Sequence, residues 1–264
     1  MRLSVFYDHI VDVHKQKNIS ICDAAKIVRD MGICYVEMNS VNLLERYHET
    51  MNILNNSNLE ISCICHFCNF EADPDVTQAI KILDIAAENG VKNVLFIPGN
   101  ISCEEKREYE IKQMINCLKL LGEYGVSKNI TICLEDFDAG TSPLSGKGLL
   151  RFLQECKQVQ CAFDTGNFLF WEEDVFQYFE LLKDKIAHVH LKDRSYIEAP
   201  GENPMITIGG DKYYSSPVGS GVIRMEDILT KLKLIKYDGI YAIEHYGAQN
   251  QLEYIKKSVD WLNR

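Results

Sequence analysis

Four short segments of the sequence each carry a potential metal-ligating side chain at the end of an apolar run. Glu135 ends Ile-Cys-Leu-Glu, Asp164 ends Cys-Ala-Phe-Asp, His190 lies in His-Val-His-Leu-Lys-Asp, and Glu244 ends Tyr-Ala-Ile-Glu. If these runs are parallel strands in a circular arrangement, their carboxyl ends meet at one mouth and the side chains converge. Three carboxylates and one imidazole favour a single divalent cation such as Mn²⁺, with Mg²⁺, Co²⁺ or Zn²⁺ as alternatives.

A cation at this mouth would polarise a substrate carbonyl and lower the cost of removing the proton next to it. The reaction also needs an acid and a base. Glu135 and Glu244 are the predicted pair, because the fifth and eighth strands place them on different sides of a bound substrate. Both glutamates are therefore predicted to bind the metal and to exchange the proton.

Other polar residues at strand ends are predicted to contact the substrate. Glu37 ends Cys-Tyr-Val-Glu and either binds substrate or orients a metal ligand, with a salt bridge inside the mouth as the structural alternative. His66 ends Cys-Ile-Cys-His and is a candidate contact to a substrate hydroxyl. Lys192 and Arg194 follow the histidine ligand and either bind an anionic or polyhydroxy substrate or remain solvated loop charges.

The elements that must position these residues alternate along the chain. Eight β-rich runs, each followed by an amphipathic stretch, indicate parallel βα units. The predicted strands are 2–7, 33–38, 60–66, 92–97, 130–135, 160–164, 186–191 and 240–244. The predicted helices are 20–31, 42–56, 74–90, 104–127, 145–158, 173–184, 224–236 and 249–262. No linker divides them, so residues 1–264 are predicted to form a single-domain (β/α)₈ TIM barrel.

One long loop interrupts this alternation. Residues 192–223 are rich in Gly, Pro, Ser and Tyr and exceed the usual length of a βα connection, so we expect them to cover the active-site mouth. An open doubly wound sheet is the competing architecture. It is disfavoured because the first run ends in Tyr7-Asp8-His9-Ile10, without the glycines of a phosphate-binding turn.

Composition limits the class of partner. The chain has 264 residues, 46% hydrophobic and 25% charged, as in ordinary globular proteins. A net charge of -10 disfavours nonspecific binding to nucleic acid or to an anionic membrane, which leaves a small molecule as the expected partner. No apolar run has the length of a transmembrane helix and no signal peptide is recognised, so a cytoplasmic protein is expected. The ten scattered cysteines are expected to be reduced thiols.

At these residues the chain resembles the xylose isomerase-like TIM-barrel superfamily, the sugar phosphate isomerase/epimerase group that also contains ketose 3-epimerases and endonuclease IV. The resemblance covers nearly the whole chain. It is carried by Gly32-Ile-Cys-Tyr-Val-Glu37, Asp164-Thr-Gly-Asn167, His188-Val-His-Leu-Lys-Asp193, Pro217-Val-Gly-Ser-Gly221 and Tyr237-Asp-Gly-Ile-Tyr-Ala-Ile-Glu244. In the ketose 3-epimerase branch, the residues matching the four strand-end residues bind one divalent metal, and the two glutamates exchange the proton. Family members often form dimers or tetramers, so the expectation of a homo-oligomer rests on the resemblance alone.

Departures from the family patterns narrow the function. Asn167 and Tyr196 stand where ketose 3-epimerases have a histidine and an arginine that contact substrate, so Asn167 is a further predicted substrate contact. Ile97 and Asn167 also replace ligands of the endonuclease IV zinc cluster. The resemblance implies a metal-dependent isomerase or epimerase of a small sugar, sugar phosphate or related polyhydroxy carbonyl compound. The alternatives are a lyase or dehydratase of the keto-cyclitol or dehydroshikimate type, an endonuclease IV-like DNA repair enzyme, and a metal-binding protein without activity.

Overall fold

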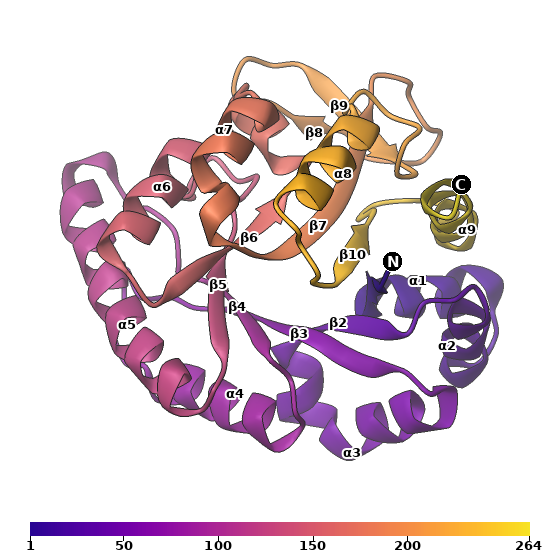
Figure 1. The fold of residues 1–264 in the computed structure, drawn as a ribbon, viewed down its shortest axis with the longest axis horizontal. Helices are drawn as coiled ribbons and strands as arrows, with labels where there is room; N and C mark the ends of the chain where they lie inside the picture. Colours follow the sequence, from indigo (N-terminus) through magenta and orange to yellow (C-terminus); the bar gives the residue numbers. More distant parts are fainter.

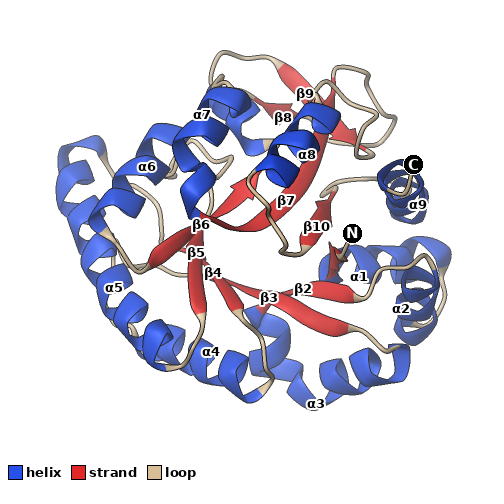
Figure 2. Cartoon of the chain, in the orientation of Figure 1, coloured by secondary structure: helices blue, strands red, loops and turns tan.

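Eight parallel strands close into a barrel with helices on its outside (Figures 1 and 2). The computed structural model describes all 264 residues. The barrel strands are β1 (Leu3–Phe6), β2 (Tyr35–Asn39), β3 (Glu60–Phe67), β4 (Asn93–Ile97), β5 (Thr131–Leu134), β6 (Val159–Asp164), β7 (Ile186–Ser195) and β10 (Tyr241–Glu244). The ring closes because β10 pairs in parallel with both β7 and β1. The predicted (β/α)₈ TIM barrel is therefore confirmed.

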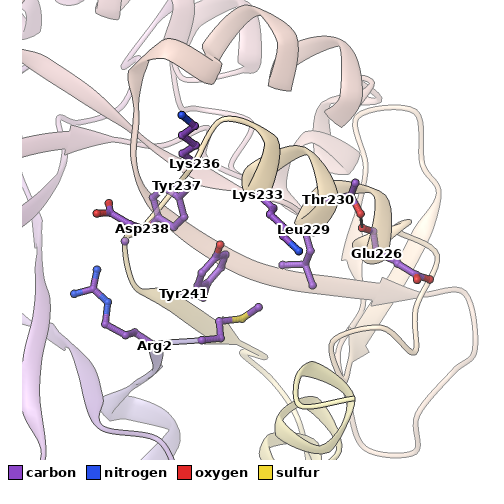
Figure 3. A pocket seen from close by; sticks show the side chains of 11 residues that line it. Arg2, Glu226, Leu229, Thr230, Lys233, Lys236, Tyr237, Asp238 and Tyr241 are labelled. Carbon is purple, nitrogen blue, oxygen red and sulfur yellow. Dashed lines mark hydrogen bonds between the residues drawn. The ribbon is translucent and has the colours of Figure 1, made fainter.

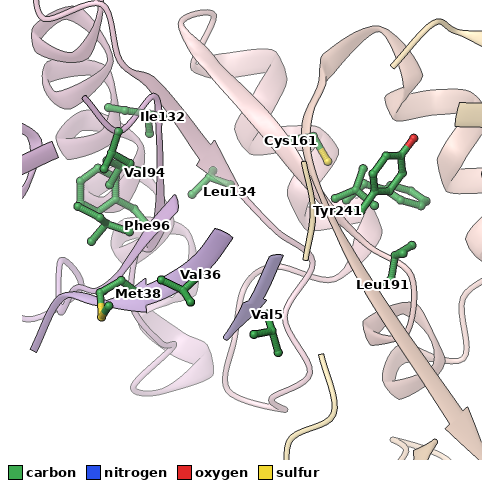
Figure 4. Close-up of a cluster of buried hydrophobic side chains, with 14 of the residues drawn as sticks. Val5, Val36, Met38, Val94, Phe96, Ile132, Leu134, Cys161, Leu191 and Tyr241 are labelled. Carbon is green, nitrogen blue, oxygen red and sulfur yellow. The ribbon is translucent and has the colours of Figure 1, made fainter. Parts of the chain in front are cut away.

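Side chains on the two faces of the strands pack into two separate hydrophobic clusters. Outward side chains such as Phe163 on β6 pack against helix residues such as Phe179 in one large hydrophobic cluster, and Figure 4 shows part of it around Val36, Phe96 and Leu134. A smaller buried cluster fills the barrel interior with Cys63, Cys65, Leu95, Ile97, Cys133 and Ala162.

The outer helices follow the predicted order, with one addition. They are α2 (Ile21–Asp30), α3 (Ser40–Ser57), α4 (Thr77–Glu88), α5 (Arg107–Ser127), α6 (Gly146–Glu155), α7 (Val175–Leu182), α8 (Met225–Leu234) and α9 (Gln251–Leu262). The addition, α1 (Tyr7–Lys17), begins directly after β1 and buries Ile10 and Val13. The sequence gives no turn signal there, because the helix starts where the strand stops. None of the helices is both long enough and apolar enough to span a membrane.

The long loop after His190 contains structure of its own. β7 runs on to Ser195 and pairs with β9 (Lys212–Ser216), which pairs in turn with β8 (Met205–Ile206); both pairings are antiparallel. The end of the loop is fixed by Asp193, whose carboxylate accepts backbone N–H bonds from Gly219 and Gly221 at 3.0 and 2.9 Å. No residue of 195–223 lines the cavity at the strand ends. Lys192, at the start of the predicted loop, lines this cavity, and the hairpin pairs with the end of β7; that the loop covers the mouth stays a prediction.

Candidate metal centre and active site

The four strand-end residues lie together at the carboxyl ends of their strands. The Nδ1 atom of His190 is 3.0 Å from Glu135 Oε2, 3.4 Å from Glu244 Oε2 and 3.7 Å from Asp164 Oδ2. All four side chains are buried, with at most 7% of any one exposed. Residues up to 109 positions apart in the sequence, from Glu135 to Glu244, therefore share one small volume, because β5, β6 and β10 end there and the neighbouring β7, which runs on to Ser195, contributes His190.

Hydrogen bonds in the turn after β6 fix the position of Asp164. Asp164 Oδ1 accepts the backbone N–H groups of Gly166 and Asn167 at 2.7 and 2.8 Å. The Thr165 hydroxyl accepts from the Lys192 backbone N–H at 2.9 Å, which ties the turn to β7. A Cβ atom at Gly166 would lie 2.7 Å from the Lys192 carbonyl oxygen, so the close approach of turn and strand needs glycine.

Three atoms at the centre of the cluster make no hydrogen bond of acceptable geometry, although two of them, His190 Nδ1 and Glu135 Oε2, lie 3.0 Å apart. They are Glu135 Oε2, Asp164 Oδ2 and His190 Nδ1. These residues each offer a ligand atom to a group whose members all lie within 4.8 Å of one another. Buried polar atoms without a partner are costly and uncommon. A donor set of carboxylate oxygens and one imidazole nitrogen is of the kind that holds a divalent cation, so the residues present fit such an ion.

Glu37 and His188 lie beneath this cluster and orient the histidine. Glu37 is fully buried and accepts a hydrogen bond from His188 Nε2 at 2.7 Å and from His190 Nε2 at 3.1 Å. Although burial alone would raise it, these two histidines hold the pKa of Glu37 well below its usual range. Because a carboxylate only accepts hydrogen bonds, a ring proton of His190 lies on Nε2 toward Glu37, and Nδ1 faces Glu135, Asp164 and Glu244.

The placement of Glu37 bears on its predicted role. Both carboxylate oxygens are occupied by histidines, and the residue does not line the cavity. The geometry therefore favours the ligand-orienting role over a direct substrate contact.

Burial also changes the acidity of the two candidate proton-transfer groups. It raises the pKa of Glu135 to about 7, although the neighbouring His190 lowers it. Burial likewise raises the pKa of Glu244, opposed by Lys192, whose Nζ lies 2.7 Å from Glu244 Oε1.

A polar network forms one wall of the site. Lys192 Nζ donates to Asn167 Oδ1 at 2.6 Å and to Asp138 Oδ2 at 3.2 Å, and Arg194 Nη2 donates to the same Asp138 oxygen at 3.1 Å. Lys192, Asn167 and Asp138 line the cavity, whereas Arg194 does not and reaches it only through Asp138. Sequence reasoning missed Asp138, whose only signal was its place three residues after Glu135.

The cavity in front of these groups has a volume of about 250 Å³. Its other wall is apolar, with Phe6, Leu95, Phe67, Phe137 and Tyr246. The ring of Phe6 packs edge-on against His190, with 5.2 Å between centroids. A substrate here would meet polar groups on one side and aromatic rings on the other. We call this space the reaction cavity.

Two further cavities lie apart from the four strand-end residues. The larger of the two, about 730 Å³, is at the opposite end of the barrel, between α8, Arg2 and the start of β10 (Figure 3). It contains none of the predicted site residues. The predicted substrate contact His66 lines a different cavity of about 380 Å³, and its Nδ1 is 2.8 Å from Ser40 Oγ.

Fold and site together define a TIM-barrel protein with a buried cluster of carboxylates and a histidine beside a cavity at the carboxyl ends of the strands. Residues 25–264 match the family model described as xylose isomerase-like TIM barrel, and the chain belongs to this family.

Individual relatives are distant. L-ribulose-5-phosphate 3-epimerase SgbU of Haemophilus influenzae, a name assigned provisionally to that protein, is 22% identical over 172 residues, 65% of this chain and 57% of its own length. The match thus spans little more than half of that relative.

The crystal structure of a protein from Bacillus anthracis, assigned as the 3-DHS dehydratase AsbF of petrobactin synthesis, superposes with a TM-score of 0.75 at 17% identity, covering 100% of this chain and 99% of that one. D-psicose 3-epimerase of Clostridium cellulolyticum H10, solved with D-tagatose, gives a TM-score of 0.71 at 12% identity, covering 100% and 97%. At these identities the two structures show a shared fold.

Proposed function

We propose that this protein is a divalent-metal-dependent isomerase or epimerase of a small sugar, sugar phosphate or related polyhydroxy carbonyl compound. The observation that carries the proposal is the set of unpartnered atoms on Glu135, Asp164 and His190, which face one another beside Glu244 at the edge of a small cavity. Membership of the family and the 3-epimerase name of the Haemophilus influenzae relative support it.

Glu135, Asp164, His190 and Glu244 would hold the ion, with Mn²⁺ favoured by the oxygen-rich donor set. Bound there, a divalent cation would polarise a substrate carbonyl and stabilise the negative charge of an enediolate. The aromatic wall of the reaction cavity would limit the access of water to the substrate.

The protein's own residues account for proton transfer and substrate orientation. Glu135 and Glu244 belong to strands that are not neighbours in the ring, and each presents a carboxylate oxygen to the reaction cavity, so one removes the proton and the other returns it. Lys192 hydrogen-bonds Glu244 and Asn167 at once, which fixes the carboxylate relative to the polar wall. Lys192 and Asn167 are the groups placed to contact substrate hydroxyls.

Solvent exchange tests this chemistry. Protein loaded with Mn²⁺ is incubated in D₂O with ketoses, ketose phosphates, inososes and hydroxypyruvate, and mass spectrometry measures incorporation of deuterium at the carbon next to the carbonyl. Deuterium uptake that disappears in Glu244→Gln, while the variant keeps the wild-type circular dichroism spectrum, supports proton exchange by Glu244. Uptake at the wild-type rate in that variant would remove Glu244 from the mechanism.

The same experiment separates the proposed reaction from dehydration. Both begin with removal of the proton beside a carbonyl, and the fold is shared with the Bacillus anthracis dehydratase. Reprotonation returns a substrate isomer in which deuterium replaces one hydrogen, whereas dehydration gives a product that has lost water. A dominant dehydrated product would replace the isomerase proposal with the lyase alternative.

A further inference from the structure

A second cavity adjoins the reaction cavity at the ends of β2 and β3. It has a volume of about 380 Å³ and extends over the start of α3 and the start of α4. Asn39 and Phe67 line both cavities, so the two are neighbours across these side chains. We call it the side cavity. None of the four strand-end residues lines it, and the proposed reaction gives it no role.

The polar lining of the side cavity is suited to hydroxyl groups. It contains the carboxylates of Asp73 and Asp75, the amides of Asn69 and Gln78, and the imidazole of His66. No lysine or arginine lines it, so a phosphate or carboxylate would meet negative charge without a counterion. Carboxylates accept hydrogen bonds, and amides and a neutral imidazole both donate and accept them, so together they suit a neutral polyhydroxy compound.

Two side chains that line the side cavity, those of His66 and Asn39, are held in place by hydrogen bonds. His66 is 9% exposed and its Nδ1 is bonded to Ser40 Oγ at 2.8 Å, which leaves Nε2 as the free ring nitrogen. Burial lowers the pKa of His66, so the ring is neutral near pH 7. Asn39 Oδ1 accepts the backbone N–H of Val41 at 3.1 Å, which orients its amide between the two cavities.

Phe67 lies between the side cavity and the reaction cavity. Its side chain is 54% exposed, an unusual degree for phenylalanine, and its ring packs against Phe137 of the reaction cavity with 6.0 Å between centroids. An exposed aromatic ring between two polar-lined spaces is a surface on which the apolar face of a sugar ring can rest.

The volumes of the two cavities also favour one ligand that occupies both. Ligand cavities usually measure about 300–1,000 Å³. The reaction cavity, about 250 Å³, falls below this range by itself, whereas the reaction and side cavities together fall within it.

We propose that the side cavity is a second substrate subsite, and that the substrate is a two-part compound whose reacting keto sugar occupies the reaction cavity and whose neutral sugar-like group occupies the side cavity. The identity of the first part rests on the proposed function. The second part is recognised by hydrogen bonds to its hydroxyls and by contact with Phe67.

Calorimetric titration of the full-length, metal-loaded protein tests the subsite directly. The probes are D-fructose, maltulose, which is fructose carrying a glucosyl group, and fructose 6-phosphate. We expect maltulose to bind about tenfold more tightly than fructose, the effect of one or two added hydrogen bonds. Fructose 6-phosphate gains no affinity from the side cavity. The ratio of maltulose to fructose affinity should fall toward one in Gln78→Leu and in His66→Phe, and stay at its wild-type value in Lys233→Gln, a matched variant in the cavity of Figure 3.

Equal affinity for fructose and maltulose in the wild type would overturn the proposal, as would failure of both sugars to bind. Tighter binding of fructose 6-phosphate than of maltulose would overturn the neutral character of the second part. These outcomes are separate from failure of the proposed function, because binding is measured without turnover: an inactive protein that prefers maltulose keeps the subsite and loses the isomerase proposal.

Discussion

Replacing Glu37 with glutamine should weaken metal binding although Glu37 does not reach the proposed ion. In the wild type each carboxylate oxygen accepts one ring N–H, from His188 at 2.7 Å and from His190 at 3.1 Å. Glutamine offers one acceptor oxygen and one NH₂ group, so one of the histidines must move its proton from Nε2 to Nδ1. Where His190 does so, the nitrogen that faces the other ligands is protonated and cannot bind a cation.

Loss of such an orienting partner typically lowers metal affinity by about 10–100-fold, or about 1.4–2.7 kcal/mol. Glu37→Leu provides no acceptor for either histidine and should fall at the upper end of this range. Competition with a chelating dye measures the Mn²⁺ and Zn²⁺ dissociation constants. Ser4→Ala is the control, because it removes another buried side-chain hydrogen bond, from Ser4 Oγ to Ser62 Oγ at 2.8 Å, away from the site. Wild-type metal affinity in both Glu37 variants would refute the orienting role.

Three further changes have defined outcomes. Asp164→Asn should lower metal affinity at least tenfold, because it replaces a charged ligand, and unchanged affinity in dye competition would exclude Asp164 from the ligand set. Lys192→Met should lower the rate of deuterium exchange with a smaller effect on metal affinity, because the Nζ contact to Glu244 at 2.7 Å is lost; equal loss of both would indicate collapse of the site. His9 and His245 should each lower the free energy of unfolding as pH falls below about 6.5, because burial holds the pKa of His245 at about 3 and that of His9 well below its usual value; Glu135, whose pKa burial raises to about 7, opposes them. Both rings bind more protons unfolded than folded in this window, and each costs about 1.4 kcal/mol per pH unit. Urea unfolding at pH 7.5 and pH 5 measures this slope, and a slope unchanged in His9→Phe would contradict the contribution of His9.

Much of the barrel could be predicted from the sequence because its strands and helices differ in period. Residues 161–163 are apolar and buried, as expected of a strand covered on both faces, and Asp164 ends the run. Because all strands of a parallel barrel point the same way, the residues that end them lie at the same mouth. The same logic located His190 and Glu244, and the structure brings these side chains together.

Features that depend on side-chain contacts between distant segments were not predictable. Asp138 belongs to the polar wall because Lys192 and Arg194, both on β7, form ion pairs with its carboxylate. His66 occupies a separate cavity because the chain after β3 turns toward α4, which no local pattern indicates. The long loop was expected to cover the mouth, but no local pattern indicated that β9 pairs with Asp193 and Arg194.

The metal content of the purified protein is the most direct test of the central claim. Mass spectrometry compares wild type with the Glu135→Gln, His190→Ala double variant after identical purification and reconstitution with Mn²⁺. We predict about one divalent ion per wild-type chain and none retained by the variant, because the substitutions remove two of the four proposed ligands. A wild-type chain that binds no divalent ion after reconstitution, or a variant that keeps its full complement, would contradict a metal centre at the strand ends.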